Sequence, residues 1–167
     1  ASSCSVYGAN GDGILDEESW LNPVSLYART RIMSEELLVR ERGSLETIIL
    51  RLSTVCGLSP RMRFDLMVNT ITARAVVDGS VRILGPSQWR PHIHVQDAAE
   101  AFLCAAVDAR PEHARGSIYN TGGDSENFTI AEVAAKVTAA VPGVAVEYVD
   151  DVDDLRSYRV SFGRIRE

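Results

Sequence analysis

The sequence lacks the features that mark several large classes of protein. Its 167 residues carry a formal net charge of −6 and no block of basic residues, which argues against nucleic-acid binding. No apolar run is long enough to cross a bilayer, and no segment resembles a signal peptide. The three cysteines are widely spaced and set among apolar neighbours, which indicates reduced thiols rather than a metal site or a disulfide framework. We therefore predict a cytoplasmic protein that binds neither nucleic acid nor membranes.

Strand-like and helix-like segments alternate along the chain. Hydrophobic residues make up 46% of it, enough to build a core. Residues 45–55 are β-branched and almost continuously apolar, which is typical of a parallel strand buried on both faces. Before them we predict a strand over 2–8, a polar loop over 9–22 and a helix over 24–41 that ends at Gly43. Strand, helix and strand in this order make a right-handed βαβ unit.

The rest of the chain continues this alternation, so the predicted fold class is α/β. Asp97 and Thr129 are placed to cap the two later helices. Residues 86–91 begin and end with proline and predict a loop. We predict helices over 65–77, 98–109 and 130–141, and strands over 81–85, 92–95, 116–123 (running into a glycine turn) and 144–149.

Tyr27 and Arg31 stand four residues apart in the first predicted helix. Side chains at this spacing share one helical face, about one turn apart. A fixed positive charge at that distance favours the phenolate form, which a tyrosine acid/base needs. The same spacing is common in surface pairs, so the neighbouring segments must decide between the two interpretations.

The chain carries five motifs, in order, that resemble one enzyme family: SSCSVYG at 2–8, Tyr27 with Arg31, RLSTVCG at 51–57, QWRPHIHVQD at 88–97 and YNTG at 119–122. Together they resemble the NAD-dependent epimerase/dehydratase family, the extended short-chain dehydrogenases that act on nucleotide sugars. The resemblance covers essentially the whole chain. It implies an α/β fold with a partial Rossmann-type parallel sheet, containing the C-terminal strands only, and a smaller α/β substrate-binding lobe.

The resemblance also implies how the chain divides between the two lobes. Residues 1–56 and 116–142 would form the C-terminal part of the dinucleotide-binding lobe, and residues 57–115 and 143–167 the substrate-binding lobe.

The resemblance implies a catalytic triad of Ser3, Tyr27 and Arg31. Tyr27 would act as the acid/base on a sugar hydroxyl, and Ser3 would share that proton. Arg31 stands where the family has lysine; arginine keeps the charge but is larger and planar, so a working site and an impaired one both stay open. Cys4 and Ser5 stand where the family's dehydratases have Asp and Glu, so loss of water from the sugar is not expected.

Binding residues are implied in the same way. Tyr27, Arg31 and Val55 would contact the cofactor, which is NAD, with NADP left open. Arg90 would hold the nucleotide diphosphate through its two-pronged guanidinium; a surface arginine in a turn is the alternative. The other implied substrate-binding residues are Thr54, Asn69, Arg82, Arg156 and Tyr158. For Arg82, packing in the core or at an edge is an equal alternative.

Two patterns that could suggest a metal site are weak. His92 and His94 share one face of a predicted strand, but no third ligand has suitable spacing. The acidic residues of 150–154 lack the regular alternation and closing glutamate of a calcium loop. We therefore predict no metal.

The glycine-rich turn that binds the dinucleotide pyrophosphate is missing from the chain. Gly11-Asp12-Gly13 follows no βα turn of that kind, and Gly122-Gly123 lies too late. In the family this motif precedes every segment matched here. We therefore expect the chain to be a fragment, the C-terminal half of a longer enzyme.

The function that these residues imply is NAD-dependent epimerisation of a nucleotide sugar through a transient keto sugar. A reductase or dehydrogenase of the same family is one alternative, and a non-catalytic module that binds sugar nucleotides or oligomerises is the other. The expected partners are a nucleotide-diphosphate sugar and a second copy of the chain in a homodimer.

Overall fold

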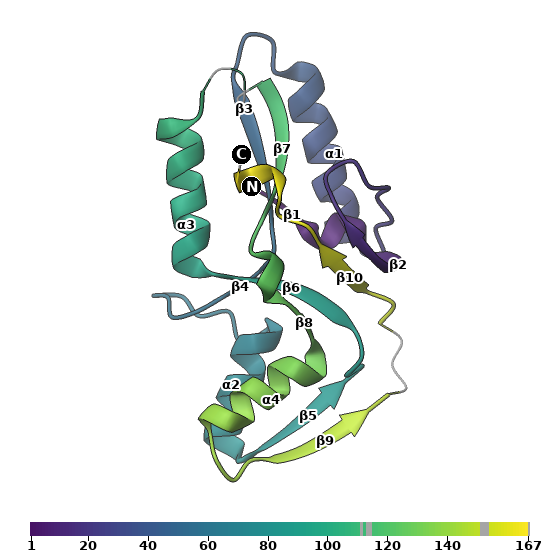
Figure 1. Cartoon of the computed structure of the whole chain (residues 1–167), viewed down its shortest axis with the longest axis vertical. Coiled ribbons are helices and arrows are strands. Elements are labelled where there is room, and N and C mark those ends of the chain that lie inside the picture. The colour runs from purple at the N-terminus through teal and green to yellow at the C-terminus, as the bar shows by residue number, and fades with distance from the viewer. Residues whose placement is uncertain (111, 113–114, 151–153, 167) are drawn as a thin grey trace.

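Three parallel strands form the centre of the upper half of the molecule (Figure 1). The computed structural model describes residues 1–110, 112, 115–150 and 154–166. The three strands pair in the order β1-β3-β7, with Arg51 opposite Ser2 on one side and Asn120 on the other. Their bounds are β1 Ser2–Ser3, β3 Thr47–Leu52 and β7 Arg115–Thr121. The predicted parallel βαβ unit is therefore present.

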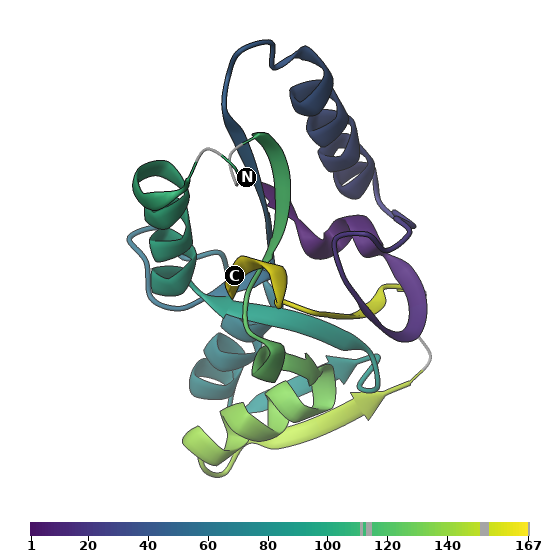
Figure 2. The same ribbon diagram turned by 45° about the horizontal axis from the view of Figure 1, so that its top comes forward.

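Helices cover both sides of these strands. In Figures 1 and 2, α1 (Leu26–Glu41) and α3 (Val95–Leu103) lie on opposite sides of β3 and β7. The Ser25 hydroxyl caps α1 by accepting a hydrogen bond from the amide of Ala28, 3.1 Å away. A π-helical turn over Cys104–Asp108 extends α3. No helix in the described part of the chain is both long and apolar enough to cross a membrane.

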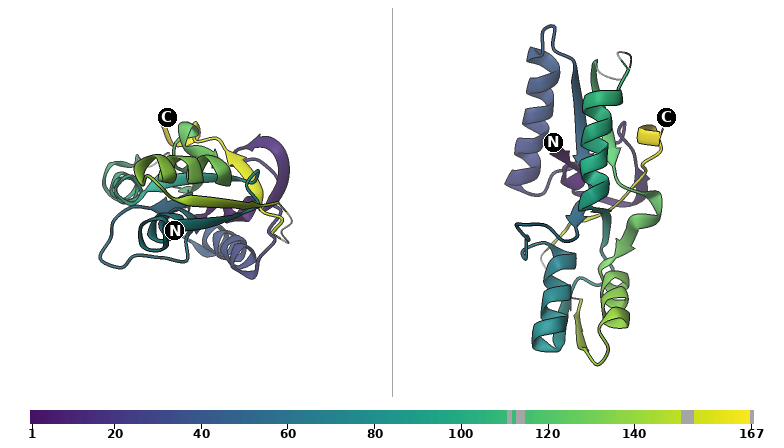
Figure 3. Two further views of the ribbon diagram at one scale, coloured as in Figure 1. Left: turned by 90° about the horizontal axis from the view of Figure 1, so that it is seen from below. Right: turned by 90° about the vertical axis from the view of Figure 1, so that its left-hand side faces the viewer.

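The lower half has its own core. Strands β5 (Ser80–Leu84) and β9 (Ala145–Val149) pair in parallel, and α2 (Met67–Asp78) and α4 (Ile130–Ala140) pack beside them. Figure 3 shows from the side that these helices lie at the opposite end from α1. The buried residues of this core are Ile71, Ala75, Val81, Ile83, Ile130, Val133, Ala134 and Val137.

Helix α4 shares that core with α2 and β5, although the predicted lobe boundaries assign α4 to the dinucleotide-binding lobe. The division into two lobes stays a prediction. Because apolar side chains are shared within a lobe rather than between lobes, we propose that residues 127–142 belong with the substrate-binding lobe.

Two further sheets join the halves. The first has the order β4-β6-β8, from Thr54–Cys56, Trp89–His94 and Asn127–Thr129. The second pairs β2 (Ala9–Leu15) with β10 (Ser157–Val160) in parallel. The prediction of a loop over 9–22 is therefore wrong for its first part, because a strand from the far end of the chain pairs with it.

The predicted strand over 2–8 is also too long. It ends at Ser3, whose hydroxyl accepts a hydrogen bond from the Ser5 amide at 3.2 Å and starts a 3₁₀ turn over Cys4–Tyr7. That turn buries Cys4, Val6 and Tyr7 against residues of β2 and β10. Burial of these side chains therefore decides the local backbone.

Three smaller predictions need correction, and one is confirmed. The strand predicted over 45–55 is broken at Ser53, whose amide donates to the Thr121 carbonyl at 3.0 Å. Strand β6 begins at Trp89, inside the predicted loop. His94, not Asp97, caps α3, by accepting from the Gln96 amide. Thr129 caps α4 as predicted, in a reciprocal capping box with Glu132.

Candidate active site

Tyr27 and Arg31 are in contact on one face of α1. The guanidinium carbon of Arg31 lies 5.0 Å from the centroid of the Tyr27 ring. Arg31 Nη1 also donates a hydrogen bond to the carbonyl of Ala1, 3.3 Å away, so the same side chain contacts the residue before β1. The Tyr27 side chain is 52% exposed. The pair therefore presents a phenol and a fixed cation to solvent, beside the strand that carries Ser3.

Ser3 lies at the end of β1, where its hydroxyl accepts from the Ser5 amide. The preceding residue, Ser2, is buried and its hydroxyl donates to Glu35 on α1. Ala1 and Ser2, the two residues before Ser3, thus both contact the helix that carries Tyr27 and Arg31. The catalytic roles of Ser3, Tyr27 and Arg31 stay a prediction.

Glu35 and Arg51 form a buried ion pair beneath this face of α1. Their side chains are 5% and 3% exposed, and Arg51 Nη2 lies 2.7 Å from Glu35 Oε2 while Nε lies 3.0 Å from Oε1. Burial opposes the charge on Arg51 most strongly, but the hydrogen bonds and charge interactions with Glu35 and Tyr7 together outweigh it and hold the Arg51 pKa above its ordinary value. Glu35 follows Tyr27 and Arg31 at four-residue intervals, so one helical face carries all three.

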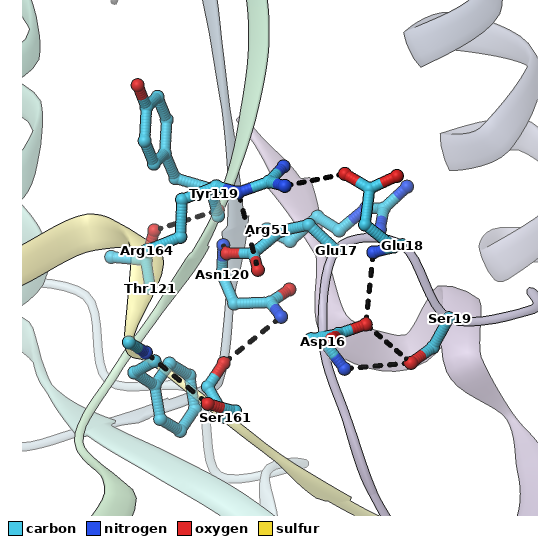
Figure 4. Close-up of polar contacts among 12 residues, drawn as sticks. Asp16, Glu17, Glu18, Ser19, Arg51, Tyr119, Asn120, Thr121, Ser161 and Arg164 are labelled. Carbon is cyan, nitrogen blue, oxygen red and sulfur yellow. Dashed lines mark hydrogen bonds and ion pairs between the residues drawn. The ribbon is translucent and has the colours of Figure 1, made fainter. Parts of the chain in front are cut away.

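The ion pair continues into a buried hydrogen-bond network. Arg51 Nη1 donates to the Tyr7 hydroxyl at 3.1 Å, and that hydroxyl lies 2.7 Å from Asn120 Oδ1. Burial raises the Tyr7 pKa, so this hydroxyl keeps its proton and can donate it. The side-chain Nδ2 of Asn120 in turn donates to the Ser161 carbonyl at 3.2 Å, and its backbone amide donates to Glu17 Oε1 at 2.7 Å (Figure 4). The network ties α1 to β3, β7 and the segment after β10.

This network was not found from the sequence. Tyr7 is buried, so it is a packing aromatic whose hydroxyl needs partners inside the protein. One signal was available: Arg51 interrupts an apolar strand, and a buried arginine needs a partner of opposite charge. Glu35, on the inward face of the neighbouring helix, was the acidic residue to test.

Cys4 and Ser5, where the dehydratases have carboxylates, offer no acid or base. Burial raises the pKa of the Cys4 thiol to about 12, and its sulfur lies 3.1 Å from the Arg51 carbonyl oxygen. The hydroxyl of Ser5 is buried. A thiol with that pKa stays protonated at neutral pH and so cannot act as a base; that these positions do not remove water stays a prediction.

Arg90, Asp154 and Arg156 make a second charged cluster, at the start of β6. Arg90 is buried, and burial lowers its pKa. Its guanidinium donates to Asp154 Oδ2 at 3.3 Å and lies 5.7 Å from the ring of Tyr158, whose pKa burial raises to about 12. A surface arginine in a turn is therefore the wrong alternative for Arg90. Three implied substrate-binding residues, Arg90, Arg156 and Tyr158, are brought together here.

The other implied binding residues lie elsewhere. Asn69 is buried on α2 and donates to the Arg63 carbonyl at 3.1 Å, while Thr54 and Val55 are partly buried on β4. Arg82 is exposed on β5 and pairs with Glu147 of β9 at 3.4 Å, which excludes core packing.

The described residues contain no group of three or more histidine, cysteine or acidic side chains that could hold a metal ion. His92 is buried and His94 exposed, so the two do not share an environment. Asp151 and Asp153 of the acidic loop lie outside the described residues.

Acid is expected to destabilise the protein through His92. This side chain lines a cavity of about 520 Å³ with Cys56 and Glu126. Burial lowers its pKa below the ordinary 6.5, the charge of Arg90 acts in the same direction, and Glu126 opposes them. A depressed pKa in the folded state means that stability is full above pH 6.5 and falls as pH drops below it, by at most about 1.4 kcal/mol per pH unit.

Urea unfolding at pH 7.5 and 5.5 checks this expectation. His92→Gln, which cannot titrate, should lose less stability between the two pH values than the parent protein. His94→Asn is the matched control, because it removes an exposed imidazole and keeps a good capping residue. An equal loss in the His92→Gln variant and the parent would refute the role of His92.

The model of the NAD dependent epimerase/dehydratase family matches residues 1–122. The chain belongs to this family. The predicted α/β class, with a partial Rossmann-type parallel sheet, is confirmed by the structure and by its solved relatives.

Three known proteins are similar to this chain in sequence or in structure. A protein of Bacillus subtilis strain 168 described as uncharacterized UDP-glucose epimerase YtcB is 29% identical over 140 residues, covering 82% of the chain. MoeE5 in complex with UDP-glucuronic acid and NAD is 29% identical over 99% of the chain, with a TM-score of 0.81. A dTDP-glucose 4,6-dehydratase from Bacillus anthracis, in complex with NAD, shares the fold at 23% identity, 99% coverage and a TM-score of 0.81.

The chain spans about half the length of these relatives. It covers 42% of YtcB, 55% of MoeE5 and 52% of the dehydratase.

Proposed function

We propose that the chain carries the catalytic residues of an NAD-dependent nucleotide-sugar epimerase. The observation that carries this proposal is the contact of Tyr27 with Arg31 on α1, next to β1 and Ser3, in a member of this family. The reaction inverts a carbinol carbon of the sugar through a transient keto sugar.

The three residues have separate tasks in this reaction. Tyr27 takes the proton of the sugar hydroxyl as the carbon is oxidised, and returns a proton when the keto sugar is reduced. Arg31 places a permanent positive charge 5.0 Å from the Tyr27 ring, beside the hydroxyl whose proton moves. Ser3 donates to the same sugar oxygen and keeps it in line with Tyr27.

NAD, when bound, supplies the hydride acceptor and donor. The residues present fit it: Arg31 Nε is a buried donor without a hydrogen-bond partner among the described residues, and a ribose hydroxyl is a suitable acceptor. We propose that Tyr27, Arg31 and Val55 contact the cofactor, which is NAD or, as the alternative, NADP.

The substrate that we propose is a nucleotide-diphosphate sugar. Arg90 and Arg156 supply guanidinium groups suited to phosphate oxygens. Uridine nucleotides are the first to test, because MoeE5 is described with UDP-glucuronic acid and YtcB as a UDP-glucose epimerase. Thr54, Asn69, Arg82 and Tyr158 are the further substrate-binding residues that we propose.

A second candidate is a non-catalytic module, and one observation favours it. The chain's single lysine, Lys136 on α4, lies over the ring of Phe128 on β8, so no lysine stands beside Tyr27 in place of Arg31. A reductase or dehydrogenase using the same residues is the other alternative.

Homodimer formation is proposed through α1, whose exposed face carries Leu26, Met33 and Leu37. A cytoplasmic location stays a prediction.

We further propose that a glycine-rich dinucleotide-binding half completes the site. The support is the coverage of about half of each relative. We refer to the chain together with such a half as the complete enzyme.

The test is product analysis with a panel of nucleotide sugars and NAD in the complete enzyme. An epimerised nucleotide sugar, with no net change in cofactor absorbance at 340 nm, is expected. Net accumulation of reduced cofactor would establish a dehydrogenase instead. Binding of a nucleotide sugar without any product would establish the non-catalytic module.

A further inference from the structure

The carboxylate of Asp154 receives hydrogen bonds from two arginines. Arg156 donates through Nε to Oδ1 at 2.8 Å and through Nη2 to Oδ2 at 2.7 Å. Arg90 Nη2 reaches the same Oδ2 at 3.3 Å, and the Arg156 backbone amide donates to Oδ1 at 3.0 Å. Both carboxylate oxygens are therefore used.

Arg90 is held in place independently of Asp154. Its Nη1 donates to the carbonyls of Trp89 (2.9 Å) and Arg156, and its Nη2 to Gln88 Oε1 at 3.1 Å. The Arg90 side chain is only 10% exposed, whereas the Asp154 and Arg156 side chains are 35% and 48% exposed. Arg90 is the fixed member of the cluster, and Asp154 and Arg156 face solvent.

A phosphate and a carboxylate present similar oxygens to a guanidinium fork. The two-pronged contact with Asp154 therefore occupies the Arg156 donors that a phosphate would use. Arg90 and Arg156 together carry two positive charges and Asp154 one negative charge, so the cluster has a net charge of about +1 and can accept a further anion. An anionic ligand that displaced the Asp154 carboxylate would bind both guanidinium groups and would no longer be repelled by that carboxylate.

We propose that Asp154 is a built-in competitor, a carboxylate that occupies Arg90 and Arg156 until the diphosphate of a nucleotide displaces it. This inference rests on the proposed function, since it presumes that the ligand is a nucleoside diphosphate. Competition of this kind lowers the affinity for the nucleotide and so favours release of product. It also keeps Arg156 paired while no nucleotide is bound.

Removing the Asp154 carboxylate is therefore expected to tighten binding of UDP by about threefold to tenfold, the range for a part-exposed ion pair plus the removal of one repulsive charge. Isothermal titration calorimetry with UDP at low ionic strength measures it. Asp154→Asn keeps the shape of the side chain, and Asp154→Ala excludes a new contact from the asparagine amide. Glu41→Gln, which removes one negative charge from an exposed pair with Arg40 at the far end of α1, is the control and should leave the affinity unchanged. Circular dichroism checks that each variant is folded.

The outcomes separate this inference from the proposed function. Tighter UDP binding by both Asp154 variants, or binding by them alone, supports both. Equal or weaker binding by the Asp154 variants, with clear binding by the parent, overturns the competitor and leaves the proposed function standing, because Asp154 would then only hold the arginines in place. Absence of UDP binding in the parent and in all variants overturns both.

Discussion

Replacing Glu35 with glutamine is expected to lower the free energy of unfolding by about 3–5 kcal/mol, the cost of leaving one partner of a buried ion pair unpaired. Arg51 would keep its charge at 3% side-chain exposure and lose the carboxylate 2.7 Å away. The same change weakens the tie between α1 and β1, because the Ser2 hydroxyl donates to Glu35. Urea unfolding with linear extrapolation measures the loss.

Two further variants make this result specific. Glu41→Gln removes a carboxylate from the exposed pair with Arg40 and should cost less than about 1 kcal/mol. In the double variant Glu35→Gln with Arg51→Met, the loss should be smaller than the sum of the two single losses, because no charge is left buried without a partner. A Glu35→Gln loss as small as that of Glu41→Gln would contradict the buried ion pair.

Replacing Tyr27 with phenylalanine in the complete enzyme is expected to lower kcat by about 10²- to 10⁴-fold, the usual contribution of a positioned acid/base. Folding should be unaffected, since the side chain is 52% exposed and its ring contact with Arg31 does not need the hydroxyl. Steady-state turnover of the nucleotide sugar and the urea midpoint provide the two measurements.

Tyr148 is a matched control for this variant. It is equally exposed, at 52%, and lies on β9 in the lower half of the molecule. Tyr148→Phe should therefore keep full activity. If Tyr27→Phe were as active as Tyr148→Phe, Tyr27 would not be the acid/base, and the contact with Arg31 would be a surface pair.

Local signals in the sequence were sufficient for several elements. Thr129 and Glu132 predict the start of α4, because a capping box is formed by two residues that are three positions apart in the sequence. The apolar residues before Ser53 predict β3 because a strand buried on both faces tolerates few polar side chains. The four-residue spacing of Tyr27 and Arg31 predicts that they share a helical face, and their contact in the structure confirms this.

Long-range partners explain what could not be predicted. Residues 9–15 have the glycines and polar side chains of a loop, and they form β2 only because β10, at the other end of the chain, pairs with them. Glu35 on its helix resembles a solvent-exposed acid, and only Arg51 on β3 makes it a buried partner. Asp154 was counted with an acidic loop, although Arg90 and Arg156 converge on it. In each case the deciding contact lies outside any local sequence window.

The most direct test of the proposed epimerase is to follow a deuterium label placed on the carbinol carbon of the substrate, using UDP-glucose first and then the panel. Mass spectrometry of the products formed by the complete enzyme with NAD reports where the label goes. We expect an epimerised nucleotide sugar that keeps its deuterium, because the hydride removed from the carbon returns to the same sugar, and we expect Tyr27→Phe to form none. Failure to epimerise any sugar of the panel, or label found only in reduced cofactor, would contradict the proposed epimerase function.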